Sequence, residues 1–337
     1  MLMIRAAVVG VGSMGNNHAR IYREMDGVEL VCVVDQDPAT AARVGARYSV
    51  PSFTDVEAML AARKPDLVSL AVPTGLHYAI GSQLIQQGVH LLIEKPIAAT
   101  VEEGEKLIEL ASKHGVILAV GHIERFNPAV MELERRLRDG MAGRIYQVHT
   151  QRLGPYPSRI RDAGVVIDLA THDIDLIRWL INDQIVRIHG ETLQSINSDR
   201  EDMFNGLMRF GNGAMGVLNV NWMTPTKVRS LTATGARGMF VCNLLSQELT
   251  FYENGEVRDG WDALNILYGV SEGNVIGLRL HRHEPLMAEL SDFVSAVREQ
   301  RQPVVTGESA LETLRIATQF VCSANAVEAV SVESAAN

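Results

Sequence analysis

A glycine-rich segment near the N-terminus has the spacing that binds a dinucleotide. Gly10–Gly15 reads G-V-G-S-M-G, which matches G-x-G-x-x-G and follows an apolar run. In such a segment the first glycine permits a tight turn, the second lets the backbone approach a pyrophosphate, and the third allows close packing of helix on strand. A helix that begins near Ser13 would present free N–H groups to the phosphates. The residues expected at a cofactor are therefore Gly10, Gly12, Ser13, Met14 and Gly15.

An acidic residue follows this segment at the distance that such a site requires. Asp35 lies twenty residues after Gly15, at the end of the next apolar run. A carboxylate at this place accepts hydrogen bonds from both ribose hydroxyls and repels a 2′-phosphate, so the pattern favours NAD over NADP. The alternative is a glycine turn that binds nothing, with Asp35 an ordinary residue at a strand end.

A lysine at the end of another apolar run could stabilise negative charge. Glu94-Lys95-Pro96 follows Val89–Ile93. Ligands of open α/β sheets bind at the carboxyl ends of the strands, where Lys95 could hydrogen-bond a reacting oxygen. Pro96 raises the possibility of a cis bond that fixes the direction of the lysine. Alternatively, Lys95 is a solvated charge at a strand end.

A third segment could supply a general base. On a regular helix Asp168, His172, Asp175 and Trp179 fall on one face, because their spacings are i, i+4, i+7 and i+11. The pKa of histidine lies near neutrality, and a carboxylate one turn away can orient its ring. The alternative is a solvated acidic face with a bystander histidine. The spacing of zinc-binding histidine motifs is absent, so we expect no metal.

Arginines cluster just before this helix. The ten-residue, Pro/Gly-rich segment 152–161 contains three arginines, Arg152, Arg159 and Arg161, together with Tyr156. Guanidinium groups in such a loop are suited to hold a phosphate or a carboxylate. An ordinary solvated loop is the alternative.

The first 120 residues alternate short apolar runs with helical patterns, which predicts a doubly wound parallel sheet covered on both faces. The expected strands are Ile4–Gly10, Val28–Asp35, Asp66–Val72, Val89–Ile93 and Val116–Val120. After Gly121 the pattern changes to longer, alternating strands with helices at the ends, which is typical of an α+β domain with a mostly antiparallel sheet. We therefore expect a Rossmann domain at residues 1–121 and a substrate-binding and oligomerisation domain at residues 122–330.

The composition limits the classes of partner and compartment. The chain has 337 residues, 31 basic and 40 acidic side chains, and a net charge of −9. An acidic chain without a basic block is poorly suited to bind nucleic acid. Its longest charge-free stretch, Leu67–Ile93, is interrupted by proline, glycine and glutamine, so we expect no membrane span. Three cysteines without metal spacing favour a reduced cytoplasm.

Taken together, the motifs resemble the glucose–fructose oxidoreductase / inositol dehydrogenase / MocA (Gfo/Idh/MocA) family over nearly the whole chain. The resemblance implies a Rossmann domain, a second domain with an open-faced sheet that forms dimers or tetramers, and NAD-dependent oxidation of a small molecule. It also implies that Lys95 and His172 are the catalytic pair and that Asp168 supports them. Residues placed along the cofactor by the resemblance are Val72, Pro73, Thr74, His77, Glu94 and Lys95.

Within the family, the segment 121–128 and the arginine loop are similar to the nucleotide-sugar branch, and most of all to the UDP-N-acetylglucosamine 3-dehydrogenases. This similarity implies oxidation at C3 of a UDP-linked N-acetylhexosamine. The arginines and Tyr156 would then hold the diphosphate, and Arg125 and Asn127 the sugar. Two alternatives stay open: a dehydrogenase of a free polyol or monosaccharide, and a regulator that senses NAD without catalysis.

Overall fold

The computed structural model describes residues 3–156, 164–196, 200–255 and 272–324. Its contacts divide the chain into two units, each of which is described by itself. The first unit comprises residues 1–135 and 279–315, and the second comprises residues 136–278 and 316–337. The expected boundary lies at residue 121, whereas this division falls at residue 135 and assigns a late segment of the chain to the first unit.

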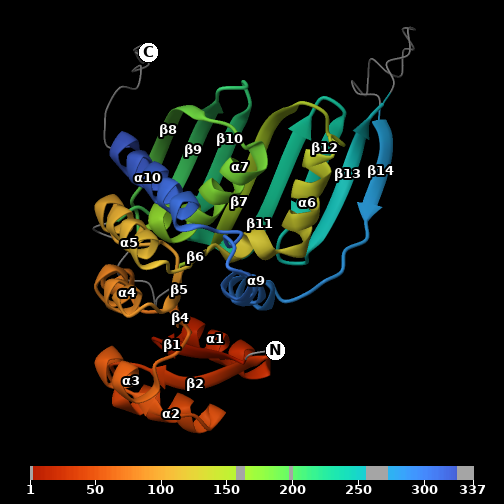
Figure 1. Cartoon of the computed structure of the whole chain (residues 1–337). Coiled ribbons are helices and arrows are strands. Elements are labelled where there is room, and N and C mark those ends of the chain that lie inside the picture. The colour runs from red at the N-terminus through yellow and green to blue at the C-terminus, as the bar shows by residue number, and fades with distance from the viewer. Residues whose placement is uncertain (1–2, 157–163, 197–199, 256–271, 325–337) are drawn as a thin grey trace, which may run out of the picture. The chain divides into compact units, whose positions relative to one another are not determined.

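The first unit is built on a six-stranded parallel sheet with the order β3-β2-β1-β4-β5-β6 (Figure 1). Its strands are β1 (Ile4–Val9), β2 (Val28–Val34), β3 (Ser52–Phe53), β4 (Leu67–Leu70), β5 (His90–Glu94) and β6 (Leu118–Gly121). The strand order reverses between β1 and β4, which is the place where doubly wound sheets bind ligands. This sheet confirms the Rossmann domain expected from the sequence; only the two-residue strand β3 was not anticipated.

Helices cover both faces of this sheet, as a parallel sheet of apolar strands requires. They are α1 (Ser13–Glu24), α2 (Pro38–Tyr48), α3 (Val56–Arg63), α4 (His77–Gln86), α5 (Val101–His114), α9 (Pro285–Glu299) and the first half of α10 (Gly307–Ala324), with short 3₁₀ turns η1 (Thr74–Leu76) and η2 (Ile123–Phe126). The apolar face of α9, including Leu290 and Phe293, lies in the same core cluster as Tyr22 of α1. A helix from the C-terminal part of the sequence thus completes the core of the N-terminal sheet.

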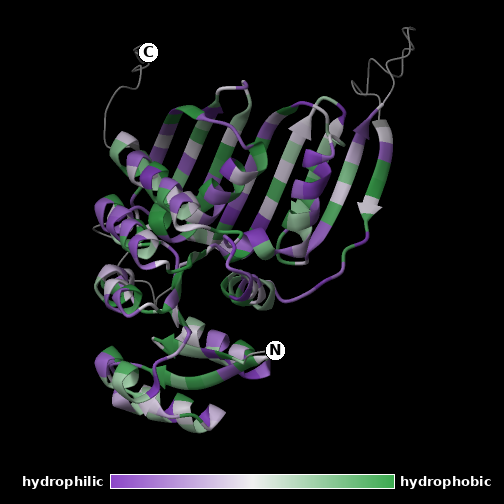
Figure 2. Ribbon diagram, viewed as in Figure 1, coloured by the Kyte–Doolittle hydropathy of each residue, from purple (hydrophilic) through white to green (hydrophobic). Residues whose placement is uncertain are grey.

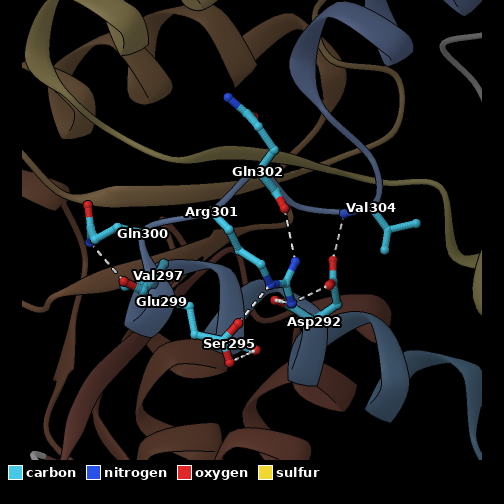
Figure 3. Close-up of polar contacts among 8 residues, drawn as sticks. All are labelled: Asp292, Ser295, Val297, Glu299, Gln300, Arg301, Gln302 and Val304. Atoms are coloured by element: carbon cyan, nitrogen blue, oxygen red, sulfur yellow. Dashed lines mark hydrogen bonds and ion pairs between the residues drawn. The ribbon is translucent and has the colours of Figure 1, made fainter.

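The turn after α9 is organised by one arginine (Figure 3). Gln300 ends the helix in the left-handed conformation, with φ of 53°. The guanidinium of Arg301 then donates to Asp292 at 2.8 Å and to Glu299 at 3.1 Å, while Asp292 also accepts the backbone N–H of Val304 at 2.8 Å. The following residues pair with the free edge of β6 through a bridge between Ala119 and Thr306. The arginine network thus shapes the turn after α9, and the bridge between Ala119 and Thr306 joins the residues that follow to the Rossmann sheet.

The second unit contains an eight-stranded sheet with the order β14-β13-β12-β11-β7-β10-β9-β8, in which only β7 and β10 pair in parallel. The strands are β7 (Ile145–Pro155), β8 (Ile185–Leu193), β9 (Met203–Phe210), β10 (Met215–Asn221), β11 (Met223–Gly235), β12 (Gly238–Asn243), β13 (Glu248–Asn254) and β14 (Glu272–Leu278). This confirms the expected mostly antiparallel sheet, although β8 and β14 were not anticipated. Helix α6 (Pro128–Arg138) spans the boundary between the units.

One face of this sheet is covered by helix α7 (Thr171–Ile181), which packs on β7 and β10. A Cβ atom on Gly216 would lie 2.6 Å from Ile177, so the glycine lets the helix approach the strand closely. On the face away from α7, apolar side chains such as Leu207 and Tyr252 are exposed. Figure 2 shows the resulting alternation along these strands, in contrast to β2, in which Leu30–Val34 is an unbroken apolar run.

Candidate active site

The glycine segment forms the turn that the sequence predicts, between β1 and α1. Gly10 has φ of +82°, and a Cβ atom at this position would lie 2.6 Å from the carbonyl oxygen of Ala71. A Cβ atom on Gly15 would lie only 1.8 Å from the carbonyl oxygen of Gly10. These two glycines are therefore required by the backbone itself. A Cβ atom on Gly12, in contrast, would meet nothing within 4 Å, which leaves open space where a pyrophosphate would approach.

Beside this turn lies a cavity of about 550 Å³, large enough for part of a dinucleotide. Its walls include Gly10, Gly12, Val34, Asp35, Gln36, Asp55, Glu57, Val72 and Pro73. The Asp35 carboxylate accepts the backbone N–H of Val11 at 2.9 Å and that of Asp37 at 3.0 Å, which holds it at the mouth of the glycine turn. Together with Asp55 and Glu57 it makes the wall acidic, which suits ribose hydroxyls and opposes a 2′-phosphate. The residues present therefore fit NAD.

His77 supports this cavity from behind. Its ring is 1 % exposed, with Nδ1 2.9 Å from the carbonyl oxygen of Pro96 and Nε2 3.0 Å from the carbonyl oxygen of Val72. Burial lowers the pKa of His77, so the ring is neutral at pH 7 and has one N–H to donate. The resemblance places His77 along the cofactor, and in the structure its two ring nitrogens face backbone carbonyls. Thr74 begins the 3₁₀ turn η1 that leads to His77.

Lys95 follows the last residue of β5 and is half-buried. The Lys95–Pro96 bond is cis, as the sequence suggested. The neighbouring Glu94 carboxylate accepts a hydrogen bond from the ring of His18, whose Nε2 lies 3.0 Å from Oε1 of Glu94. Burial disfavours ionisation of Glu94, but the hydrogen bond and charge of His18, and then the charge of Lys95, outweigh this and lower the pKa of Glu94. Glu94 is thus a carboxylate at pH 7.

A second acid lies near this pair, on α9. Glu289 is 2 % exposed, and neither carboxylate oxygen has a hydrogen-bond partner among the described residues. Burial, and then the charges of Glu94 and Asp292, raise the pKa of Glu289 well above its ordinary value. The negative charge is therefore on Glu94. Sequence reasoning did not find His18 or Glu289; the one available signal was a polar residue on the apolar face of an expected helix.

In the second unit, the helix that carries His172 is not a regular α-helix. Val166–Ala170 forms a π-helical turn in which the N–H of Thr171 donates to the carbonyl of Val166, and α7 begins at Thr171. The wider turn shifts Asp168 around the helix axis relative to Asp175, so the single face expected from regular spacing is not kept. π-Helical turns are frequent at functional sites. His172 is half-buried at the first turn of α7.

The acidic residues beside His172 are not solvated. Asp173 and Asp175 are each 1 % exposed. Asp173 receives two hydrogen bonds from the guanidinium of Arg152, at 2.9 Å and 3.2 Å, and Arg152 is itself 4 % exposed. A bidentate ion pair therefore links β7 to the first turn of α7. The sequence assigned Arg152 to a diphosphate; the structure gives it a partner within the protein with which a diphosphate would have to compete.

The remaining expected substrate residues have local partners or lie outside the described part. Arg125 is 5 % exposed and donates to Ser309 at 2.7 Å, and the Asn127 side chain accepts the N–H of Ala129 at the start of α6. Both therefore stabilise the chain around η2. The ring of Tyr156 packs edge-on against Trp222 at 5.8 Å. Arg159 and Arg161 lie outside the described residues.

Within residues 3–156, 164–196, 200–255 and 272–324, no group of three or more histidine, cysteine or acidic side chains could hold a metal ion. No helix within those ranges is long and apolar enough to cross a membrane.

Comparison with protein families identifies both parts of this architecture. A model described as oxidoreductase family, NAD-binding Rossmann fold, matches residues 4–122, and a model of the Gfo/Idh/MocA C-terminal domain matches residues 130–241. The chain belongs to the Gfo/Idh/MocA family. It is an oxidoreductase with NAD as its cofactor, which agrees with the glycine turn, the cavity and Asp35.

Known relatives of this family member span almost its whole length. UDP-N-acetylglucosamine 3-dehydrogenase of Acidithiobacillus ferrooxidans is 29 % identical, over 95 % of this chain and 96 % of the relative. A solved structure of that enzyme has a TM-score of 0.85 and covers 96 % of this chain and 98 % of the other. The scyllo-inositol 2-dehydrogenase (NAD(+)) of Bacillus subtilis is 26 % identical, over 93 % of this chain and 92 % of the relative. The family thus contains dehydrogenases of both nucleotide sugars and free polyols.

The two kinds of glycine in the turn lead to a test of the cofactor site. Gly12→Ala is expected to keep the thermal stability of the protein and weaken NAD binding at least tenfold, because the methyl group enters the open space beside the turn. Gly15→Ala is expected to lower both stability and binding, because it collides with Gly10. Calorimetric titration with NAD and thermal unfolding measure the two effects. The matched control is Gly277→Ala, whose Cβ atom also meets nothing. Equal NAD affinity in Gly12→Ala and wild type would contradict the placement.

Proposed function

We propose that this enzyme oxidises a secondary hydroxyl of a sugar, with Lys95, His172 and Asp168 as its catalytic residues. The observation that carries the proposal is the position of Lys95 at the carboxyl end of β5. The next residue, Pro96, contacts His77 through its carbonyl, and His77 also contacts Val72 at the wall of the NAD cavity. Ligands of doubly wound sheets bind at these strand ends. A half-buried lysine there is suited to stabilise an oxyanion.

The proposed roles follow from the chemistry of each side chain. His172 removes the proton of the hydroxyl, since an imidazole has a pKa near neutrality. The ammonium of Lys95 donates a hydrogen bond to the same oxygen and stabilises the developing alkoxide. Asp168, one turn before His172, supports the imidazolium that forms. When bound, NAD supplies the hydride acceptor at its nicotinamide ring.

For the substrate we propose a UDP-linked N-acetylhexosamine oxidised at C3. This is supported by similarity over nearly the full length to an enzyme named UDP-N-acetylglucosamine 3-dehydrogenase. Tyr156, Arg159 and Arg161 are the proposed contacts to the diphosphate, and Arg125 and Asn127 form the expected sugar end. A free polyol is the second candidate, because a scyllo-inositol dehydrogenase also aligns over nearly the whole chain.

We further propose that the enzyme is a homodimer or homotetramer that associates through the face of the second sheet away from α7. This face carries large apolar side chains that are 41–64 % exposed: Leu193, Leu207, Met215, Tyr252 and Val275. Eight strands spaced about 4.8 Å apart, each about seven residues long, present roughly 800 Å², which is the area that one partner contributes to a stable interface. Such an exposed apolar surface is uncommon on a monomer.

A cytoplasmic location is also part of the proposal. The three cysteines, Cys32, Cys242 and Cys322, are all free thiols in the structure. Free thiols are typical of a reducing compartment.

The catalytic assignment predicts that His172→Ala and Lys95→Ala each lower turnover by about 10²–10⁴ while NAD binding changes little. Steady-state kinetics with UDP-N-acetylglucosamine, inositols and free hexoses would measure the loss, and calorimetry the NAD affinity. His114→Ala is the control, because His114 is an exposed histidine in the last turn of α5, outside the proposed site and the proposed interface. Turnover close to that of wild type in either catalytic variant would refute the assignment.

The substrate assignment predicts that Arg159→Glu/Arg161→Glu raises the KM for UDP-N-acetylglucosamine at least tenfold, since both charges are reversed against the diphosphate. The KM for any accepted polyol should stay within about twofold. As control, Arg23→Glu/Arg63→Glu makes the same change in net charge on exposed helix ends of the first unit. If the KM for the nucleotide sugar does not change, the polyol candidate is favoured.

The oligomer proposal predicts that Leu207→Glu/Met215→Glu shifts the protein toward monomer in sedimentation velocity, because buried carboxylates oppose association. Leu245→Glu, at an equally exposed leucine outside this face, should leave the assembly unchanged. A wild-type protein that sediments as a monomer would exclude the proposed interface.

A further inference from the structure

The two residues that flank Lys95 in the sequence are each held by a buried histidine. The Glu94 carboxylate contacts the ring of His18, which is fully buried in α1. The Pro96 carbonyl contacts the ring of His77, which is buried at the start of α4. Helix α1 begins at the glycine turn, and α4 follows the turn that contains Val72 and Pro73. The lysine therefore lies between two links to elements that form the cofactor cavity.

The contact on the Glu94 side has little freedom. Glu94 pairs in register with Gly121 of β6, and a Cβ atom on Gly121 would lie 3.1–3.2 Å from the Glu94 carboxyl atoms. The carboxylate thus lies directly over the backbone of the neighbouring strand, a position that a larger residue at 121 would crowd. With Glu289 neutral nearby, the negative charge of Glu94 faces His18. A charge-assisted hydrogen bond in a buried setting is stronger and more directional than a neutral one.

The contact on the Pro96 side joins two strand ends. His77 reaches the carbonyl of Pro96, after β5, and the carbonyl of Val72, after β4. These strands are neighbours in the sheet. The imidazole is a rigid plane, so it fixes the separation of the two backbone segments rather than merely filling space between them. The neutral ring has one N–H, so one of the two carbonyls accepts a hydrogen bond from it, and the tautomer with the proton on Nδ1 is the one that links Pro96.

We propose that His18 and His77 are positioning residues for Lys95. His18 acts through the side chain of Glu94, and His77 acts through the backbone of Pro96, so that the lysine has a defined direction before any ligand binds. A side chain at a free strand end would instead sample several rotamers, and its charge would be less effective at a reacting oxygen. The expected effect on turnover rests on the proposed catalytic role of Lys95. The ordering of the Lys95 side chain is independent of that role.

The composition of the chain offers a direct readout of this ordering. The sequence has five lysines, and the other four, Lys64, Lys106, Lys113 and Lys227, are exposed whereas Lys95 is half-buried. Reductive methylation with ¹³C-formaldehyde therefore gives few ¹H–¹³C signals, and Lys95→Arg assigns the one from Lys95. In wild type this signal is expected to be shifted from those of the exposed lysines, without NAD or substrate present.

Replacing each histidine by glutamine and by asparagine gives two variants of similar polarity, of which one keeps the contact under test and the other removes it. The amide nitrogen of glutamine takes the place of Nε2 of histidine, and that of asparagine takes the place of Nδ1. His18→Gln keeps the contact to Glu94 and His18→Asn removes it, since that contact is made by Nε2. His77→Asn keeps the contact to Pro96 and His77→Gln removes it, since that contact is made by Nδ1. We expect the Lys95 signal to move toward those of exposed lysines in His18→Asn and His77→Gln only.

The control is a histidine at the other end of the same strand. His90 begins β5, and its Nδ1 accepts the backbone N–H of Ile117. His90→Asn and His90→Gln should both leave the Lys95 signal in place. Thermal unfolding identifies any variant that does not fold, and the comparison within each pair then relies on the members that do. An unchanged Lys95 signal in folded His18→Asn and His77→Gln overturns the proposal, as does an equal shift in both members of each pair.

Kinetics then distinguish this proposal from the proposed function. Turnover is expected to fall at least tenfold in His18→Asn and to recover in His18→Gln, with NAD affinity within about threefold in both. Introduced into Lys95→Ala, His18→Asn should cost no further activity, because its effect is exerted through the lysine. A moved Lys95 signal together with normal turnover in Lys95→Ala would reject the catalytic role and keep the positioning role. Normal turnover in His18→Asn beside a slow Lys95→Ala would reject the catalytic consequence of positioning.

Discussion

The contact between His18 and Glu94 is the interaction on which the end of β5 depends. A mostly buried carboxylate is unfavourable unless hydrogen bonds and opposite charge compensate it. Here the compensation comes from a fully buried imidazole and from the adjacent lysine, while the nearby Glu289 holds a proton and adds no second charge. This division of charge between two acids lets one of them serve as a fixed anion beside Lys95.

A comparable interaction stabilises the part of the second unit that carries the proposed base. The buried pair of Arg152 and Asp173 joins β7 to α7 immediately after His172. Removing one partner of such a pair leaves an uncompensated charge, so both residues constrain the local backbone. The π-helical turn lies just before it and holds Asp168. In both units, therefore, the residue next in sequence to a proposed catalytic side chain is held by a buried partner, His18 for Glu94 and Arg152 for Asp173.

The sequence predicted the features that have a strong local signal. Strands such as β2 and β5 are apolar on both faces, and the glycines of the turn have the spacing that a dinucleotide site requires. The Rossmann sheet and the NAD site could therefore be predicted from the sequence. Strand β8 was missed because it alternates and has charged residues on its exposed face, and β3 because two residues carry no periodicity. The π-helical turn was missed because regular spacing was assumed. The partners of Arg152, Arg125 and Asn127 depend on contacts that no local pattern contains.

The return of residues 279–315 to the first unit also bears on how such a protein can be divided. The chain passes from one unit to the other at residues 135, 278 and 315, so no single cut separates them. A fragment that stops at residue 121 would lack α9 and leave the apolar face around Tyr22 open to water, where it would favour aggregation. In topological terms most of the second unit is inserted into the first. Exchange of the inserted part by recombination therefore requires two crossovers that flank the insertion, and the Rossmann core closes only after synthesis has passed beyond it.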